Sequence, residues 1–140
     1  MVPFVELLER AENGEARAQY ELGLAYSSGR QVVQDLEEAV NWWRQAFEQG
    51  LEEPIYELAQ AYGQGGPGLE RDLAESFYWW LQAAKWGRLE AATQACWRVG
   101  QAYANGVGVA QDFDQARRWL AKASEQGLAE AEAFLSQLVP

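Results

Sequence analysis

One spacing occurs three times along the chain and limits what it can fold into. An aspartate is followed 15 residues later by a glycine in the segments Asp35–Gly50, Asp72–Gly87 and Asp112–Gly127. The aligned residues inside these segments are Leu36/Leu73/Phe113, Ala39/Ser76/Ala116, Trp42/Trp79/Trp119, Trp43/Trp80/Leu120 and Ala46/Ala83/Ala123. These positions lie three or four residues apart, which places their side chains on one face of a helix. Glycine after the last turn is a typical helix end, so the sequence predicts one helix in three copies.

A second helix is predicted before each of these. Each copy has an apolar residue four positions before a tyrosine, in the pairs Leu22–Tyr26, Leu58–Tyr62 and Val99–Tyr103. The two helices of a copy are joined by a glycine-bearing loop and form a helical hairpin. A single hairpin buries its apolar stripe only partly, so we expect the copies to stack on one another.

The motifs themselves resemble a known family. LGxxYxxG at Leu22–Gly29, VGxAYxNGxGV at Val99–Val109, the aspartate that opens the second helix, and the AxxQG-like ending are similar to Sel1-like repeats, a subclass of tetratricopeptide-like helical repeats. The resemblance covers almost the whole chain. It implies an all-α fold, a right-handed α/α solenoid used for protein–protein contact, and it implies no single activity.

Three local departures from the pattern leave the predicted fold intact. Gln31 replaces the loop glycine of the first copy, and Gly65–Gly68 makes the second loop one residue longer. Pro54 falls in the first turn of a helix, where its missing N–H costs little.

We expect a single domain over residues 1–140. Its predicted parts are a capping helix in 1–14, repeats in 15–50, 51–87 and 88–127, and a capping helix in 128–140, from about Ala129 to Leu138. Phe4, Leu7, Leu8 and Ala11 form the apolar stripe of the first capping helix. Val99 follows Gly87 by 12 positions, where the other copies have 8. Four extra residues are about one helical turn, so we expect the insertion Leu89–Ala92 to lengthen that helix.

Charge and composition narrow the partners. The chain has 11 Lys and Arg against 21 Asp and Glu, a net charge of −10, which disfavours nucleic acid and anionic membranes and favours a partner with a basic patch. No stretch approaches the roughly 20 apolar residues of a membrane span. The first ten residues lack the basic and apolar regions of a secretory signal, and the lone Cys96 excludes an intramolecular disulfide. We therefore expect a cytoplasmic protein.

Catalysis has little support in the sequence. The chain has no histidine, which removes Ser–His and Cys–His pairs and most zinc sites. The carboxylate pairs Glu37–Glu38, Glu52–Glu53 and Asp112–Asp114 fall near predicted helix starts, where acids favour the helix dipole. The glycine-rich loops lack the Lys-Ser/Thr of a phosphate loop. We expect no enzyme activity, no cofactor and no metal.

The first helix of each hairpin carries a mostly polar stripe, away from its apolar residues. At i, i+4, i+7 and i+11 the stripe reads Arg17, Glu21, Leu24, Ser28; Glu53, Glu57, Gln60, Gln64; and Gln94, Arg98, Gln101, Asn105. First helices line the concave side in such solenoids, so the resemblance implies that this stripe binds the partner. The alternative interpretation is an ordinary solvated helix face.

Tyr78 and Trp86 are aromatic where the first copy has Asn41 and Gln49, so the repeat does not require them. A partly exposed aromatic pair would anchor an interface; alternatively, the two rings cover the inserted turn at Leu89. The other tryptophans are predicted to pack in the core.

The predicted function is a protein–protein interaction module without catalytic activity. Glu21, Glu53 and Glu57 favour a cationic partner, while Gln60, Gln94, Arg98 and Gln101 supply adaptable hydrogen bonds. The resembling family includes bacterial assembly scaffolds and neutralising partners of antibacterial effectors. An adaptor and an immunity-type inhibitor therefore both stay open, and so does the oligomeric state.

Overall fold

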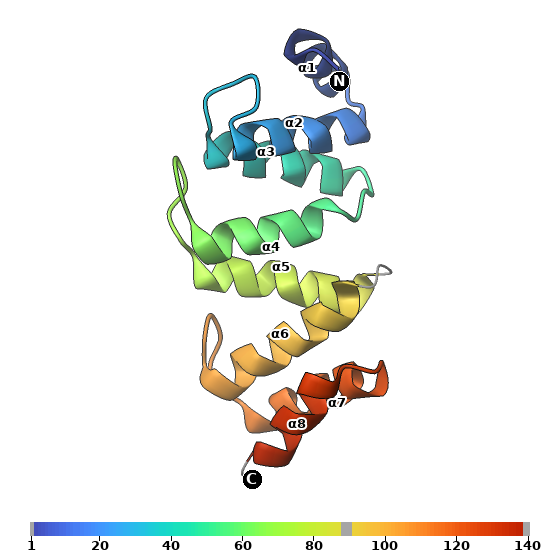
Figure 1. The fold of residues 1–140 in the computed structure, drawn as a ribbon, viewed down its shortest axis with the longest axis vertical. Coiled ribbons are helices and arrows are strands. Elements are labelled where there is room, and N and C mark those ends of the chain that lie inside the picture. The colour runs from blue at the N-terminus through green and yellow to red at the C-terminus, as the bar shows by residue number, and fades with distance from the viewer. Residues whose placement is uncertain (1, 88–90, 139–140) are drawn as a thin grey trace. The chain divides into compact units, whose positions relative to one another are not determined.

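The computed structural model describes residues 2–87 and 91–138, and over these residues the chain is all-α (Figure 1). Its eight helices there are α1 Phe4–Glu12, α2 Ala16–Ser28, α3 Leu36–Glu48, α4 Pro54–Gln64, α5 Leu73–Trp86, α6 Ala91–Asn105, α7 Phe113–Glu125 and α8 Ala129–Gln137. No strand occurs in the described ranges, where a single isolated bridge joins Gly66 to Leu69. The predicted all-α fold is confirmed.

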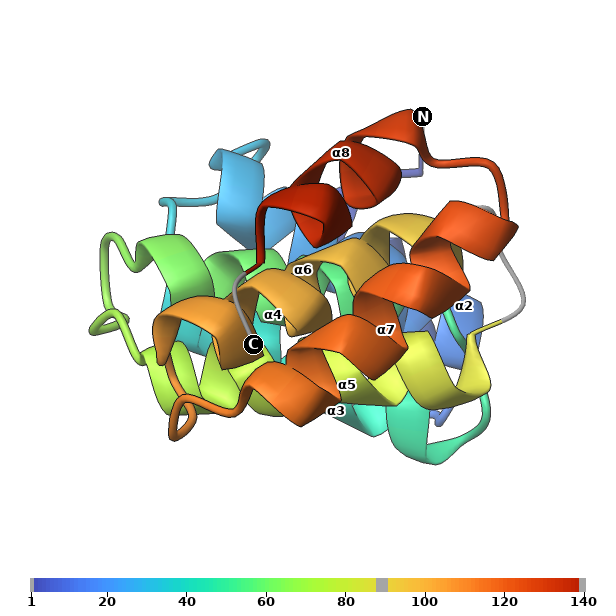
Figure 2. The same ribbon diagram turned by 90° about the horizontal axis from the view of Figure 1, so that it is seen from below.

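The helices belong to two compact units, one ending at Asp72 and the other beginning at Leu73. In the first, α1 packs on α2, α2 on α3 and α3 on α4, coloured dark blue to green in Figure 1. In the second, α5 packs on α6, α6 on α7 and α7 on α8, and Figure 2 shows α7 in orange and α8 in red. Each unit thus consists of helices that pack in the order in which the chain presents them.

The same backbone hydrogen bond closes every hairpin loop. The amide of Asp35 donates to the carbonyl oxygen of Tyr26 at 2.9 Å, and the pairs Asp72–Tyr62 and Asp112–Tyr103 repeat it at 2.8 Å. The second loop holds one more residue than the others and still forms this bond. The aspartates and tyrosines that define the repeat in the sequence are therefore equivalent in the fold.

The aspartate also explains where the second helix of a repeat starts. Asp35 accepts hydrogen bonds from the backbone N–H groups of Glu37 and Glu38, and Asp112 accepts one from Gln115. Such N-caps satisfy amides that have no partner within the helix. Asp35 and Asp112 thus cap the helices that they precede.

Core residues come from the predicted apolar stripes. Leu22, Leu58, Val99 and Leu120 are fully buried. The stripe of α1 packs where expected, with Leu7 and Ala11 buried against Ala18 and Leu22. Phe113 is the exception because, as the first residue of α7, it stays exposed.

The tryptophan columns pack less uniformly than predicted. Trp79 is 4% exposed and Trp43 is 2% exposed, whereas Trp42, Trp80 and Trp119 are only partly buried. A β-carbon at Gly23 would lie 2.3 Å from Nε1 of Trp43, so this glycine admits the indole. Gly100 makes the same room for Leu120. In the second copy, Trp79 is the buried tryptophan rather than Trp80.

Each hairpin loop also contacts the start of an earlier helix. In the first copy, the side-chain oxygen of Gln31 accepts a hydrogen bond from the Phe4 amide at 3.1 Å. In the second, the Pro67 carbonyl accepts one from the Leu36 amide at 2.8 Å. In the third, a β-carbon at Gly108 would lie 2.3 Å from the Leu73 carbonyl oxygen. Loops thus connect successive repeats within a unit.

The insertion in the third copy lengthens α6, which has 15 residues against 13 in α2 and 11 in α4. Ala91 and Ala92 are helical as predicted; Leu89 lies outside the described residues. Among the helices described, none has the length and hydropathy needed to cross a membrane.

Candidate protein-binding surface

The polar stripe divides between the two units. In the first unit, the α2–α4 stripe comprises Arg17, Glu21, Leu24, Ser28, Glu53, Glu57, Gln60 and Gln64. Arg17, Glu21, Gln60 and Gln64 are exposed, whereas Leu24, Glu53 and Glu57 are partly buried. The expected solvated face is therefore interrupted at the two glutamates of the second copy.

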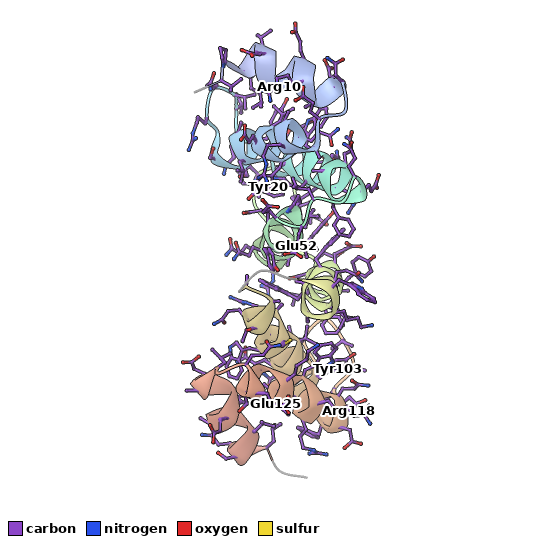
Figure 3. All side chains as sticks on the ribbon, turned by 90° about the vertical axis from the view of Figure 1, so that its right-hand side faces the viewer. Arg10, Tyr20, Glu52, Tyr103, Arg118 and Glu125 are labelled. Atoms are coloured by element: carbon purple, nitrogen blue, oxygen red, sulfur yellow. The ribbon has the colours of Figure 1, made fainter. Side chains whose placement is uncertain are left out.

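Contacts between repeats explain this interruption. Arg17 Nη2 lies 2.7 Å from Glu53 Oε2, and the Tyr20 hydroxyl donates a hydrogen bond to Glu57 Oε1 at 3.1 Å. The Arg17 guanidinium also lies over the Tyr20 ring, 5.6 Å from its centre. Tyr20, labelled in Figure 3, lies on α2. Sequence reasoning missed both pairs, although the residues of each are separated by about one repeat length.

These contacts alter the electrostatics of the stripe. The hydrogen bond from Arg17 lowers the pKa of Glu53 below its ordinary value. Burial, together with the charge of Glu57, raises the pKa of Tyr20 to about 12. Both groups hold their ordinary neutral-pH forms firmly, and a cationic partner must compete with Arg17 for Glu53. Glu21 is exposed and forms no ion pair with any residue that the structure describes.

In the second unit, the α6 stripe comprises Gln94, Arg98, Gln101 and Asn105. Gln101 is partly buried and the other three are exposed. The Arg98 guanidinium lies over the indole of Trp80 on α5, 4.8 Å from the ring centre. This contact uses the tryptophan that is only half-buried, and it was not anticipated from the sequence.

The two aromatic residues that the repeat does not require are exposed. Tyr78 is 47% exposed and Trp86 is 70% exposed, both on α5. The Tyr78 ring packs edge-on against Trp79 at 5.1 Å, which holds its orientation. Eight residues separate Tyr78 and Trp86, so the rings lie about 12 Å apart along the helix axis. They present two separate apolar contacts.

Groups with chemical reactivity are placed in structural roles. Cys96 is buried, its Sγ lies 3.9 Å from the Ala84 carbonyl oxygen, and burial raises the pKa of its thiol. A raised pKa and burial both oppose nucleophilic reactivity. No group of three or more potential metal ligands occurs among the described residues.

Comparison with known proteins identifies the repeats. The Sel1 repeat family matches the chain three times, at residues 16–51, 55–85 and 93–128, which is more than half of its length. The chain belongs to the Sel1 repeat family. Sel1 repeat proteins are in general protein–protein interaction modules and non-catalytic scaffolds.

Solved structures agree with this assignment. A Sel1 repeat protein from Oxalobacter formigenes is 34% identical, with a TM-score of 0.71 over 96% of this chain and 97% of that one. The protein c5321, a protective antigen present in uropathogenic Escherichia coli strains, is 31% identical with a TM-score of 0.64 over 94% of this chain. Cysteine rich protein B of Helicobacter pylori shares the fold, with a TM-score of 0.63 at 18% identity over 96% of this chain and 98% of that one.

Some of these relatives are much longer than this chain. The secretory immunoglobulin A-binding protein EsiB of Escherichia coli O6:H1 is 46% identical over 41 residues, which make up 29% of this chain and 8% of EsiB. The chain covers 35% of c5321. The Sel1 repeats are thus the shared part.

Proposed function

We propose that this Sel1 repeat protein is a non-catalytic interaction module that binds a partner protein or peptide on the polar stripes of its first helices. The supporting observation is that Leu22, Leu58 and Val99 are fully buried, while three of the four stripe residues in the first and third copies, and two of the four in the second copy, are exposed. The fold therefore uses one face of each helix for its core and leaves the other to solvent.

The α2–α4 stripe favours a partner with a basic patch. Glu21 offers an exposed carboxylate, and Glu53 and Glu57 flank it from the next repeat. A partner arginine or lysine would gain from Glu21 and Glu57 directly and would displace Arg17 to reach Glu53. Complementary charge of this kind speeds association and selects partners.

Tyr78 and Trp86 are proposed as a second contact of the partner. Large exposed aromatic side chains are frequent anchors of interfaces. Their positions are polar in the first copy, so the repeat itself does not require aromatic residues there.

The test begins with the partner itself. Affinity purification of the full chain from its native cell, followed by mass spectrometry, would supply a candidate, and calorimetry would measure its affinity. Replacing both Glu21 and Glu57 by Lys should weaken binding by about tenfold or more, since each charged contact contributes on the order of 1 kcal/mol or more. Circular dichroism should show unchanged helicity.

Replacing both Glu9 and Glu48 by Lys is the matched control, because Glu9 on α1 and Glu48 on α3 are exposed and lie outside both stripes. This double variant makes the same charge change and should leave affinity within about twofold of the wild type, as expected for charges remote from the interface. Equal weakening by the control would show that only net charge matters and would refute the α2–α4 stripe as the binding surface.

Two roles fit this proposal, an adaptor and an immunity-type inhibitor. Experiments on the purified complex with the partner would distinguish them. Stoichiometric inhibition of a partner enzyme or toxin would identify an immunity-type inhibitor. Simultaneous binding of two partners would identify an adaptor. The cytoplasmic location expected from the sequence stays a prediction, which cell fractionation would check.

A further inference from the structure

The α6 stripe differs in charge from the stripe of the first unit. The aligned residues Glu21, Glu57 and Arg98 occupy one column of the repeat, and Arg17, Glu53 and Gln94 occupy another. The acidic column thus changes sign in the third copy, and the α6 stripe contains no carboxylate. A partner group that suits Glu21 would be repelled by Arg98.

The α6 stripe also differs in pairing. Arg17, Glu53 and Glu57 have partners inside the first unit. By contrast, among the described residues no carboxylate pairs with Arg98, and the side chains of Gln94, Gln101 and Asn105 form no hydrogen bonds. With respect to the part of the chain that the structure describes, these four neighbouring polar side chains therefore keep their donors available.

The Trp80 ring orients the guanidinium. Arg98 is exposed, yet its planar group lies 4.8 Å from the ring centre. This cation–π contact restricts the side chain, and the guanidinium keeps the fork of N–H groups whose geometry matches a carboxylate. Less conformational freedom is then lost when a carboxylate binds.

The flanking amides indicate which kind of carboxylate fits. Gln94 stands one turn before Arg98, and Gln101 and Asn105 stand one and two turns after it. From Gln94 to Asn105 the helix rises by 11 residue steps, about 16 Å, which is the length of about five residues of extended peptide. Amides on both sides of the cation suit a chain that continues past it in both directions, whose carbonyl and N–H groups they bind.

We propose that the α6 stripe binds an internal Asp or Glu side chain of an extended partner segment, with Arg98 pairing with the carboxylate and the amides binding the peptide backbone on either side. This inference rests on the proposed function and adds the chemistry of one partner residue. It also assigns opposite charge preferences to the stripes of the two units.

The test uses the full-length chain and an array of acetylated, amidated decapeptides. In each set, one internal position is Glu, Gln or Lys on varied neutral backgrounds. We expect Glu peptides to bind about tenfold more tightly than their Gln counterparts, a difference typical of a hydrogen-bonded ion pair. Arg98→Gln should reduce the ratio of Glu to Gln affinity to about one, and Arg98→Glu should favour the Lys peptides.

Arg118→Gln is the matched control. Arg118, labelled in Figure 3, is exposed on α7 and lies outside the α6 stripe. It removes the same charge and should keep the Glu preference. Circular dichroism checks that all variants fold.

Other outcomes overturn the inference in distinguishable ways. Peptide binding without a Glu preference, or a preference that Arg98→Gln does not change, leaves the interaction module standing and removes the carboxylate site. A further set of neutral peptides with a free C-terminal carboxylate is included, and tighter binding of this set than of the Glu peptides would replace the internal side chain by a chain end. Absence of binding across the whole array would overturn the inference and count against the proposed function as well.

Discussion

At the scale of single residues, the first and third loops adopt the same left-handed backbone conformation with different residues, Gln31 and Gly108. Gly108 has φ 76° and its α-carbon lies against the Leu73 carbonyl, so this site requires both left-handed backbone and the absence of a side chain. Gln31 occupies the aligned position with φ 66°. The helix that faces the first loop, α1, starts only 10 residues before Gly14, whereas α5 starts 14 residues before Gly87. Helix α1 therefore lacks the first turn that α5 places against its loop. The Gln31 side chain has room and binds the Phe4 amide instead.

This comparison predicts a large difference between two glycines of one loop. Gly106→Ala should lower the free energy of unfolding by about 1–2 kcal/mol, because Gly106 has φ 67°. An added β-carbon there would meet no atom closer than 3.4 Å, so only the backbone conformation contributes to this loss. Gly108→Ala should cost about 1–3 kcal/mol more, since its β-carbon would overlap backbone atoms. Urea unfolding of both variants measures the difference. Equal losses would mean that the loop moves freely away from α5.

The Arg17–Glu53 pair predicts a small pH effect. A depressed carboxyl pKa stabilises the fold above the ordinary glutamate value of 4.5, and this contribution is lost as pH falls through the lower value in the folded chain. Glu53→Gln should therefore destabilise the chain near neutral pH by less than about 1 kcal/mol, because both side chains are substantially exposed, and the deficit should vanish in acid.

Chemical denaturation of Glu53→Gln over this pH range checks the expectation. Glu48→Gln, at an exposed position outside the pair, is the control and should show no comparable change. A deficit that persists in acid would assign the effect of Glu53→Gln to packing and not to charge.

At the scale of helices, sequence periodicity predicted the helices well because the same spacing of apolar residues recurs in each repeat. The helices bounded by Asp35 and Gly50 or by Asp112 and Gly127 appear where expected, and Pro54 begins α4. The pattern did not decide which of two adjacent tryptophans is buried. Neighbouring positions are about 100° apart on a helix, so the rotation of the helix about its own axis decides whether Trp79 or Trp80 faces the core.

The candidate site was predictable only as a face. The stripe residues follow from helical spacing, and their exposure agrees with it at most positions. The Arg17–Glu53, Tyr20–Glu57 and Arg98–Trp80 contacts join different helices, and their existence depends on stacking distances that one sequence does not encode locally. Aligning the copies would have shown the sign change from Glu57 to Arg98.

Helix α5 offers a matched pair of substitutions. Trp79→Ala should cost about 3–5 kcal/mol as a truncation in the core, because the side chain is 4% exposed. Trp86→Ala, at a position 70% exposed, should change stability by no more than about 0.5 kcal/mol. Thermal and urea unfolding report both values. If Trp86→Ala destabilised as much as Trp79→Ala, Trp86 would be part of the core and would not serve as an interface anchor.

At the scale of the whole molecule, charge is distributed unequally. Residues 1–72 hold 14 acidic and 5 basic residues, a net charge of −9, whereas residues 73–140 hold 7 and 6, a net charge of −1. The first unit therefore carries most of the net charge, and under the proposed function it would attract basic partners from a distance. Under the further inference, the second unit would recognise its carboxylate ligand at short range.

Self-repulsion predicts how stability depends on salt. Raising NaCl from about 10 mM to about 150 mM shortens the Debye length from about 30 Å to about 8 Å. The unfolding temperature should rise, because the repulsion in the first unit is screened. Replacing the exposed Glu9 and Glu12 by Gln should reduce this dependence. A fall in unfolding temperature would show instead that local pairs such as Arg17–Glu53 outweigh the repulsion.

The loop contacts determine which repeats an engineer can transplant. If residues 88–127 were duplicated directly after residue 127, the glycine equivalent to Gly108 in the added copy would lie against Phe113 of the original copy. Phe113 is the counterpart of Leu73, so the added repeat should dock without a steric clash. Grafting the first loop into the third repeat would instead drive the Gln31 side chain into the Leu73 carbonyl. The array can therefore be lengthened by duplicating the third repeat but not by inserting the first loop into the third repeat. The repeats are thus not interchangeable, although their sequences are similar.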